Sequence, residues 1–251
     1  VGTQNNFRRA EKAKKPIAFV INKCDHENAD FERTFNELKE VFGNKCTLFQ
    51  YPINAGKDFN AAIDVLQGKM LVWKAEGGAP EAKDIPESEK ATVEEIRAQL
   101  LEWAAESDET IMDKYFEQGT LSDDELMRGL QTVFAEGSMY PVICTSGLKD
   151  MGIRRLMGFL GEMTPSVADA PKPLTVNAEE VAPVATAPTS AFIFKTSVEP
   201  HIGEVNYFKV MQGTLKPGDD VLNVDRGTKE RISQLYSVAG NIRTAVEEVS
   251  A

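Results

Sequence analysis

Two short apolar runs, each followed at once by a polar loop, stand out in the pattern of hydrophobic and polar positions. The first covers residues 16–21 and the second covers residues 140–144. Apolar side chains at helical spacing follow each run, at Phe31, Phe35, Leu38 and Phe42 and at Ile153, Leu156, Met157 and Leu160. Apolar runs beside amphipathic helices are typical of buried parallel strands. We therefore predict that residues 1–46 and 134–164 form part of a doubly wound α/β domain.

The intervening residues 47–133 predict an α+β insertion. Strand-sized patterns lie near residues 47–53, 59–66 and 69–74. A single long helical pattern then covers residues 89–116, with inward positions expected at Val93, Ile96, Leu100, Ala104, Ile111 and Tyr115. Ser122-Asp123-Asp124-Glu125 has the sequence of a capping box, so we expect a second helix with Leu126, Leu130 and Val133 inward.

The chain changes character after residue 164. Residues 165–190 contain five prolines, many alanines and no aromatic residue, which predicts an extended linker. Short strand patterns separated by Gly- and Pro-marked turns follow, near residues 191–196, 204–211, 221–224 and 231–238. The pattern of residues 191–251 is therefore that of an antiparallel β-barrel.

The negative charge is concentrated in the insertion. The whole chain has a net charge of −11, and residues 76–136 alone contain 17 acidic and 5 basic side chains, a net of −12. A solvated surface is the commoner meaning of such a region. A docking face for a basic partner is the alternative, because carboxylates repel nucleic-acid phosphates and attract basic patches.

Composition narrows the class of protein. A chain of 251 residues with 42% hydrophobic content can bury a sizeable core, and its longest apolar runs are only strand-sized, so we expect no membrane span. Cysteines occur at positions 24, 46 and 144, which is neither an even disulfide set nor a metal-ligand spacing. A reducing cytoplasm fits this cysteine usage best.

Asn22-Lys23-Cys24-Asp25, directly after the first apolar run, has the chemistry of a guanine-binding loop. The carboxylate of Asp25 can accept hydrogen bonds from guanine N1–H and the 2-amino group, whereas adenine would leave it unpaired. The stem of Lys23 can lie along the purine face, and the amide of Asn22 can connect neighbouring loops. The same residue types are common in ordinary turns, so the tetrapeptide alone leaves both interpretations open.

The loop after the second run, Thr145-Ser146-Gly147, favours the guanine interpretation. Ligands collect at the carboxyl ends of strands in open α/β sheets, so both loops can meet at one base. A backbone N–H at Ser146 or Gly147 would suit the guanine O6 acceptor. The candidate base-binding residues are therefore Asn22, Lys23, Asp25, Ser146 and Gly147, with no candidate catalytic or metal-binding residue.

With these motifs the chain resembles the translational GTPases, most closely elongation factor G and its relatives, over nearly its whole length. The resemblance rests on residues 21–25, on residues 141–147 and on residues 206–219, which are similar to the second-domain barrel signature of that family. The chain departs from the family pattern at Thr145-Ser146-Gly147, where Gly-Ser-Ala is usual, and at Cys24-Asp25-His26, where Met-Asp-Arg is usual.

The resemblance implies a P-loop-type GTPase domain, represented here by its C-terminal half, and a β-barrel second domain. Residues 191–251 would form an incomplete barrel that contains only the first several strands of that domain. It implies GTP and GDP as ligands and a factor that binds and hydrolyses GTP to drive ribosomal translocation in protein synthesis. The sequence contains neither a Gly-x-x-x-x-Gly-Lys-Ser/Thr phosphate loop nor an Asp-x-x-Gly element. We therefore expect a fragment that meets Mg²⁺ only through a missing N-terminal portion and does not hydrolyse GTP alone.

The resemblance also implies partners, namely the ribosome and, through the second domain, ribosomal RNA. Elongation factor G carries an insertion implicated in contact with the ribosomal stalk protein. We therefore expect the same contact from the acidic insertion here, through Glu95, Glu102, Glu106 and Glu109. The alternative is a divergent paralogue, similar to release factor 3 or to ribosomal-protection proteins, that docks at the ribosomal factor site with little or no GTP turnover.

Overall fold

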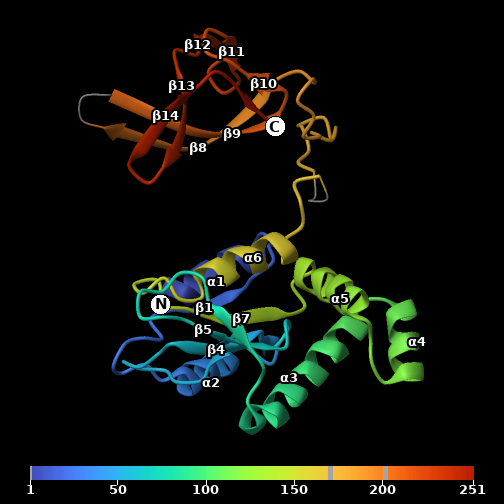
Figure 1. Cartoon of the computed structure of the whole chain (residues 1–251). Coiled ribbons are helices and arrows are strands. Elements are labelled where there is room, and N and C mark those ends of the chain that lie inside the picture. Colours follow the sequence, from blue (N-terminus) through green and yellow to red (C-terminus); the bar gives the residue numbers. More distant parts are fainter. Residues whose placement is uncertain (1, 169–171, 200–202) are drawn as a thin grey trace. The chain divides into compact units, whose positions relative to one another are not determined.

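The computed structural model describes residues 2–168, 172–199 and 203–251. The chain divides between Pro165 and Ser166 into two compact units, each of which is described by itself (Figure 1). The first unit combines small sheets with helices, and the second consists of β-strands and turns.

Strands and helices alternate at the two ends of the first unit, and a run of strands followed by a run of helices lies between them. They are α1 (Gly2–Lys12), β1 (Phe19–Ile21), α2 (Phe31–Phe42), β2 (Cys46–Leu48), β3 (Gln50–Pro52), β4 (Ala61–Asp64), β5 (Lys69–Val72), β6 (Glu81–Lys83), α3 (Glu87–Ala105), α4 (Glu109–Gln118), α5 (Asp123–Ala135), β7 (Tyr140–Cys144) and α6 (Ile153–Met163).

A three-stranded parallel sheet in the order β1-β7-β2 forms the centre of the first unit. Successive side chains of β7 point to opposite faces of this sheet. On one face, Tyr140 and Val142 pack with aromatic side chains of α1 and α2. On the other face, Ile143 belongs to a core that includes Phe159 of α6. Helices on both faces of a parallel sheet confirm the predicted α/β class.

The buried face of α6 (Ile153–Met163) differs from the prediction, which included Met157 and omitted Phe159 and Met163. Met157 is 63% exposed, whereas Phe159 and Met163 are buried and Leu156 and Leu160 pack against the core. The predicted stripe selected Met157 because apolar residues crowd this short helix, and the sequence alone does not show which of them faces the sheet.

The insertion contains a second, antiparallel sheet in the order β3-β4-β5-β6. The single strand expected near residues 47–53 is two strands. β2 pairs with β7 in the first sheet, so the expected start of the insertion at residue 47 falls inside β2, and β3 begins the second sheet. The exposed strand β6 was not predicted, because its sequence Glu-Ala-Lys lacks an apolar pattern.

The expectation of one helix over residues 89–116 is wrong, because α3 and α4 are separate helices. The Asp108 carboxylate accepts hydrogen bonds from Thr110 N at 2.6 Å and Ile111 N at 3.3 Å, and thereby caps a new helix. The predicted inward positions are nevertheless confirmed. Val93, Leu100 and Ala104 are buried, and Ile96, Ile111 and Tyr115 pack against the same core.

The predicted capping box at the start of α5 is present. Ser122 Oγ accepts from Glu125 N, and the Glu125 carboxylate accepts from Ser122 N at 3.1 Å. Hydrogen bonds from Lys114 and Ser122 lower the pKa of Glu125 to about 2. Leu126, Leu130 and Val133 are buried, as expected. Between α5 and α3, a Cβ on Gly129 would lie only 2.7 Å from the Ala104 Cβ, so the close approach of the two helices requires glycine there.

The second unit contains β8 (Ser190–Glu199), β9 (Gly203–Gln212), β10 (Thr214–Leu215), β11 (Asp220–Asn223), β12 (Thr228–Arg231), β13 (Leu235–Ala239), β14 (Ile242–Val246) and β15 (Val249–Ser250). They pair as four two-stranded antiparallel sheets around a small core of Val210, Leu215 and Leu235. The predicted strands and turns are therefore present, and the described residues form open sheets that do not close, in keeping with the predicted incomplete barrel.

The end of the expected linker packs against the strands that follow it in the second unit. Gly213 N donates to Val184 O at 2.9 Å, and Thr189 Oγ1 donates to Thr214 O at 2.8 Å. Throughout the described part of the chain, no helix has the length and apolar character needed to cross a membrane.

Candidate functional site

The two polar loops predicted to act together lie side by side at the carboxyl ends of β1 and β7. We call residues 22–25 the asparagine loop and residues 145–151 the serine loop. In the parallel register Ile21 lies opposite Cys144, so both strands end at the same level. Thr145 N donates to Ile21 O at 3.0 Å and Cys24 N donates to Thr145 O at 3.1 Å, which continues the backbone pairing into the loops.

Asn22 connects the two loops through its side chain. Its Oδ1 atom accepts hydrogen bonds from Gly147 N at 2.9 Å and from Thr145 Oγ1 at 3.2 Å. This is the loop-connecting role that the sequence predicted for the amide. Asn22 and Thr145 are separated by 123 residues in the sequence. They meet only because β1 and β7 pair in the folded sheet.

Asp25 and Ser146 form the shortest contact between the loops. Ser146 Oγ donates to Asp25 Oδ1 at 2.6 Å, and the same hydroxyl accepts from Lys149 N at 3.2 Å. Ser146 is fully buried, whereas Asp25 is half-buried. Among the described residues, Asp25 Oδ2 has no hydrogen-bond partner, so one carboxylate oxygen is held in place and the other can accept from a ligand.

The predicted N–H donors for a ligand oxygen are already engaged. Ser146 N donates to Met151 O at 2.9 Å, and Met151 N returns a hydrogen bond to Ser146 O at 3.0 Å. Gly147 N donates to Asn22 Oδ1. Sequence reasoning missed both partners, because a short loop that closes on itself is not visible in the residue pattern. A ligand oxygen at this place must share or replace the Gly147 hydrogen bond.

Lys23 and Leu148 project from the loops into solvent. Lys23 is exposed and has a φ of 65°, an uncommon left-handed conformation for a residue with a side chain. Leu148 is 90% exposed. The sequence analysis selected Lys23 but missed Leu148, for which an apolar residue directly after a polar loop was the available signal. Both side chains offer aliphatic surface to a flat ligand.

Cys24 and Cys144 lie beneath the loops in one buried cluster that also contains Met151. Hydrogen bonding with Cys24 and burial raise the pKa of the Cys144 thiol. Burial likewise raises the pKa of Cys46 to about 11. Hydrogen bonding with Cys144 lowers the pKa of the Cys24 thiol instead. Cys46 and Cys144 are therefore neutral, packed side chains at neutral pH.

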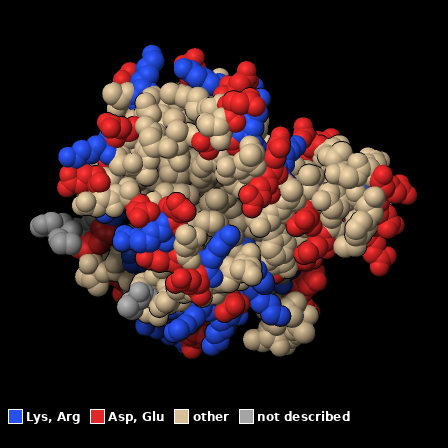
Figure 2. All heavy atoms as spheres, turned by 90° about the horizontal axis from the view of Figure 1, so that it is seen from below, with Lys and Arg blue, Asp and Glu red and all other residues tan. Residues whose placement is uncertain are grey.

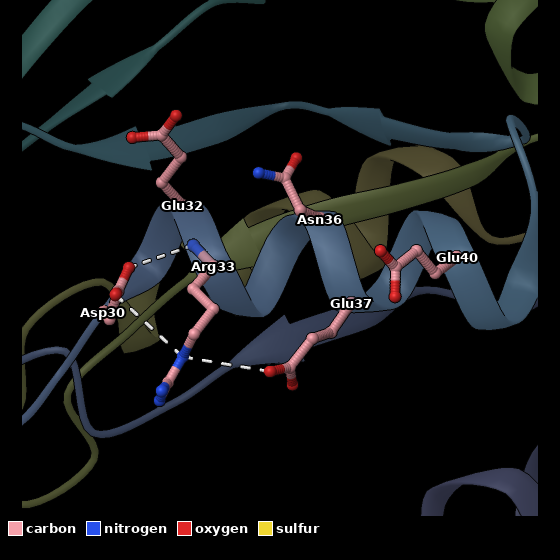
Figure 3. A pocket seen from close by; sticks show the side chains of 6 residues that line it. All are labelled: Asp30, Glu32, Arg33, Asn36, Glu37 and Glu40. Carbon is pink, nitrogen blue, oxygen red and sulfur yellow. Dashed lines mark hydrogen bonds and ion pairs between the residues drawn. The ribbon is translucent and has the colours of Figure 1, made fainter.

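A shallow hollow of about 480 Å³ lies on the exposed face of α2 and not at the two loops. Figure 3 shows its lining of Asp30, Glu32, Arg33, Asn36, Glu37 and Glu40. Asp30 caps the helix by accepting from Arg33 N at 3.0 Å, and Arg33 Nε lies 3.8 Å from Glu37 Oε1. These contacts are those of a solvated helix face.

The four glutamates selected for partner binding lie along the helical part of the insertion. Glu95 and Glu102 are on α3, Glu106 follows its last residue, and Glu109 begins α4. All four are exposed, and none forms an ion pair within the described residues. Figure 2 shows acidic side chains along the lobe on the right, on the side where Figure 1 places α4.

Comparisons with known proteins agree with the division of the chain. The family model described as Elongation factor Tu GTP binding domain matches residues 1–166, and the one described as Elongation factor G domain 2 matches residues 188–251. A crystal structure of a protein from Thermus thermophilus matches the whole chain with a TM-score of 0.81 and 27% sequence identity. The chain spans 35% of the length of that protein. From the family model that covers residues 1–166, together with this fold, we conclude that the chain belongs to the translational GTPases of the elongation factor G type.

Proposed function

We propose that the asparagine and serine loops bind the guanine base of GTP and GDP through Asn22, Lys23, Asp25, Ser146 and Gly147. The observation that carries this proposal is the hydrogen bond of 2.6 Å from Ser146 Oγ to Asp25 Oδ1. It fixes the orientation of a half-buried carboxylate whose other oxygen can accept from the guanine N1–H and 2-amino edge. Adenine has no matching donors at this edge and would leave the carboxylate desolvated and unpaired.

The other residues of the site would complete base recognition. The exposed stems of Lys23 and Leu148 offer apolar contact to the purine faces. The Gly147 N–H, now bonded to Asn22, would turn toward the guanine O6 atom. The residues present do not fit a phosphate or Mg²⁺ site, because the sequence contains no Gly-x-x-x-x-Gly-Lys-Ser/Thr motif. We therefore assign only base binding to these residues.

At the level of the whole protein, we propose a cytoplasmic translation factor that uses GTP hydrolysis to drive translocation on the ribosome. Membership of the translational GTPases and the domain 2 match at residues 188–251 support this role. The second candidate is a paralogue, similar to release factor 3 or to ribosomal-protection proteins, that docks at the ribosomal factor site with little GTP turnover. The departures at Thr145-Ser146-Gly147 and His26 favour that alternative.

We further propose that the acidic helices of the insertion dock the ribosomal stalk protein. Four exposed glutamates without ion-pair partners in the described residues support this surface, since unpaired carboxylates attract a basic partner. Contact of the second unit with ribosomal RNA rests on family resemblance alone.

The base-binding proposal is tested by Asp25→Asn in the natural protein that contains this chain. An amide reverses one donor–acceptor match, so the variant should lose GDP affinity and gain affinity for xanthosine diphosphate. Fluorescence titration with both nucleotides measures the exchange. A variant that still strongly prefers GDP would exclude Asp25 from base recognition. Asp30→Asn on α2 is the matched control and should leave both affinities unchanged.

A further inference from the structure

Two turns of the antiparallel insertion sheet lie directly against the asparagine and serine loops. The first insertion turn, residues 53–60, connects β3 to β4, and the second insertion turn, residues 73–80, connects β5 to β6. Gly56 N in the first turn donates to Cys24 O at 2.8 Å, and Lys149 Nζ of the serine loop donates to Lys57 O at 3.2 Å. In the second turn, Gly78 N donates to Asp150 O at 2.9 Å.

The backbone of Gly77 lies close against the backbone of Lys149 in the serine loop. A Cβ atom placed on Gly77 would lie 1.8 Å from Lys149 O and 2.9 Å from Lys149 C. Both neighbours are backbone atoms, which cannot move aside by a change of rotamer. The contact therefore exists only because residue 77 has no side chain.

Gly78 supplies an internal comparison. Gly77 has a φ of 72° and Gly78 has a φ of 86°, so a side chain at either position strains the backbone in a similar way. A Cβ on Gly78, however, would meet no atom within 4 Å. Both positions therefore require a positive φ, but only a side chain on Gly77 would collide with Lys149.

The serine loop connects the backbone of Lys149 to the base-binding residues by hydrogen bonds. It is short and closed by the paired hydrogen bonds between Ser146 and Met151. Lys149 N donates to Ser146 Oγ at 3.2 Å, and that hydroxyl holds Asp25 Oδ1. A shift of the Lys149 backbone must therefore move Ser146 Oγ and release Asp25 from its fixed orientation.

We propose that the two insertion turns position the serine loop for guanine recognition, with Gly77 as the positioning residue of the second turn, and that they set the affinity and selectivity of the nucleotide site. This inference rests on the proposed role of the two loops in base binding. It makes the antiparallel sheet of the insertion a structural support of the nucleotide site, so that displacement of this sheet changes nucleotide affinity.

The test compares Gly77→Ala with Gly78→Ala in the natural protein that contains this chain. Titrations with GDP and inosine diphosphate report positioning, because inosine lacks the 2-amino group that Asp25 would accept from. Gly77→Ala should raise the Kd for GDP at least about tenfold, the scale of one lost hydrogen bond to a charged group. It should also bring the two Kd values closer together. Gly78→Ala should keep both within about twofold of the wild type, as a change that removes no contact.

A milder variant decides the question if Gly77→Ala does not fold. Lys149→Met removes only the exposed hydrogen bond to Lys57 O and should raise the Kd for GDP about threefold, the scale of one weak hydrogen bond. Lys69→Met, which removes a surface ion pair with Asp84 on the same sheet, should leave the Kd unchanged.

The outcomes separate the two proposals. A wild-type protein that does not distinguish GDP from ADP contradicts the base-binding function itself. If the wild type is selective but Gly77→Ala binds like Gly78→Ala, only the positioning role is overturned. The same conclusion follows if Gly77→Ala does not fold and Lys149→Met binds like Lys69→Met.

Discussion

Asp64 carries a carboxylate into the apolar core between β4 and α6. Its side chain is 1% exposed, and Arg155 Nε donates to its Oδ2 atom at 2.6 Å. Gln50 Nε2 and Gln67 N donate to the same carboxylate, both at 2.9 Å. Arg155 also pairs with Glu162 at 3.0 Å. The charge of Asp64 is thus compensated by groups from both the insertion and α6.

Because a buried charge without its partner is costly, Arg155→Met should destabilise the protein by about 3 kcal/mol. The matched control Lys69→Met breaks an ion pair in which Asp84 is almost fully exposed, and it should leave the free energy of unfolding nearly unchanged. Chemical denaturation measures both free energies of unfolding. Equal effects of the two substitutions would show that burial does not govern the strength of the Asp64–Arg155 pair.

At the residue scale, sequence reasoning predicted the residues of the two loops but not the hydrogen bonds and packing contacts that hold them in place. Asn22, Asp25, Ser146 and Gly147 could be selected because polar residues after buried strands meet at one sheet edge. The hydrogen bonds that occupy the Ser146 and Gly147 N–H groups were not predictable, since they depend on the closure of a six-residue loop. The contacts of Asp64 and Gly77 join segments far apart in the chain, and no local pattern indicates them.

At the scale of elements, the break between α3 and α4 shows where periodicity misleads. Apolar residues continue at helical spacing through the break, so the pattern predicts one helix. Asp108 begins a second helix because its carboxylate satisfies two backbone N–H groups that a continuous helix would pair internally. The capping box at Ser122 was predictable because both of its partners lie within four residues.

The helical face of the insertion carries the prediction on partner docking. Reversal of Glu95, Glu102, Glu106 and Glu109 to lysine should weaken stalk-dependent stimulation of GTP hydrolysis about tenfold at low ionic strength, because charge steering speeds association by at least that factor. Steady-state hydrolysis with and without the stalk protein measures the effect, and GDP affinity should be unchanged. Reversal of Glu32 and Glu40 on α2 is the control. Unchanged stimulation in the insertion variant would contradict docking at this face.

At the scale of the whole molecule, composition predicted where the chain divides but not how the strands of the second unit pair. The proline- and alanine-rich segment marks the change between the two units, and the first family model ends at residue 166, next to the structural division after Pro165. The pairing of the strands in the second unit was not predictable in detail, because pairing between distant strands depends on non-local contacts. The sequence therefore indicates the order of the parts more firmly than their internal topology.

The most direct test of the account is a titration of the natural protein that contains this chain with GDP and with ADP. A site built around the oriented carboxylate of Asp25 should bind GDP more tightly than ADP by a factor of roughly 10⁴. That result would establish the two loops as a guanine site. Similar affinity for the two nucleotides, or no binding of either, would contradict the central claim.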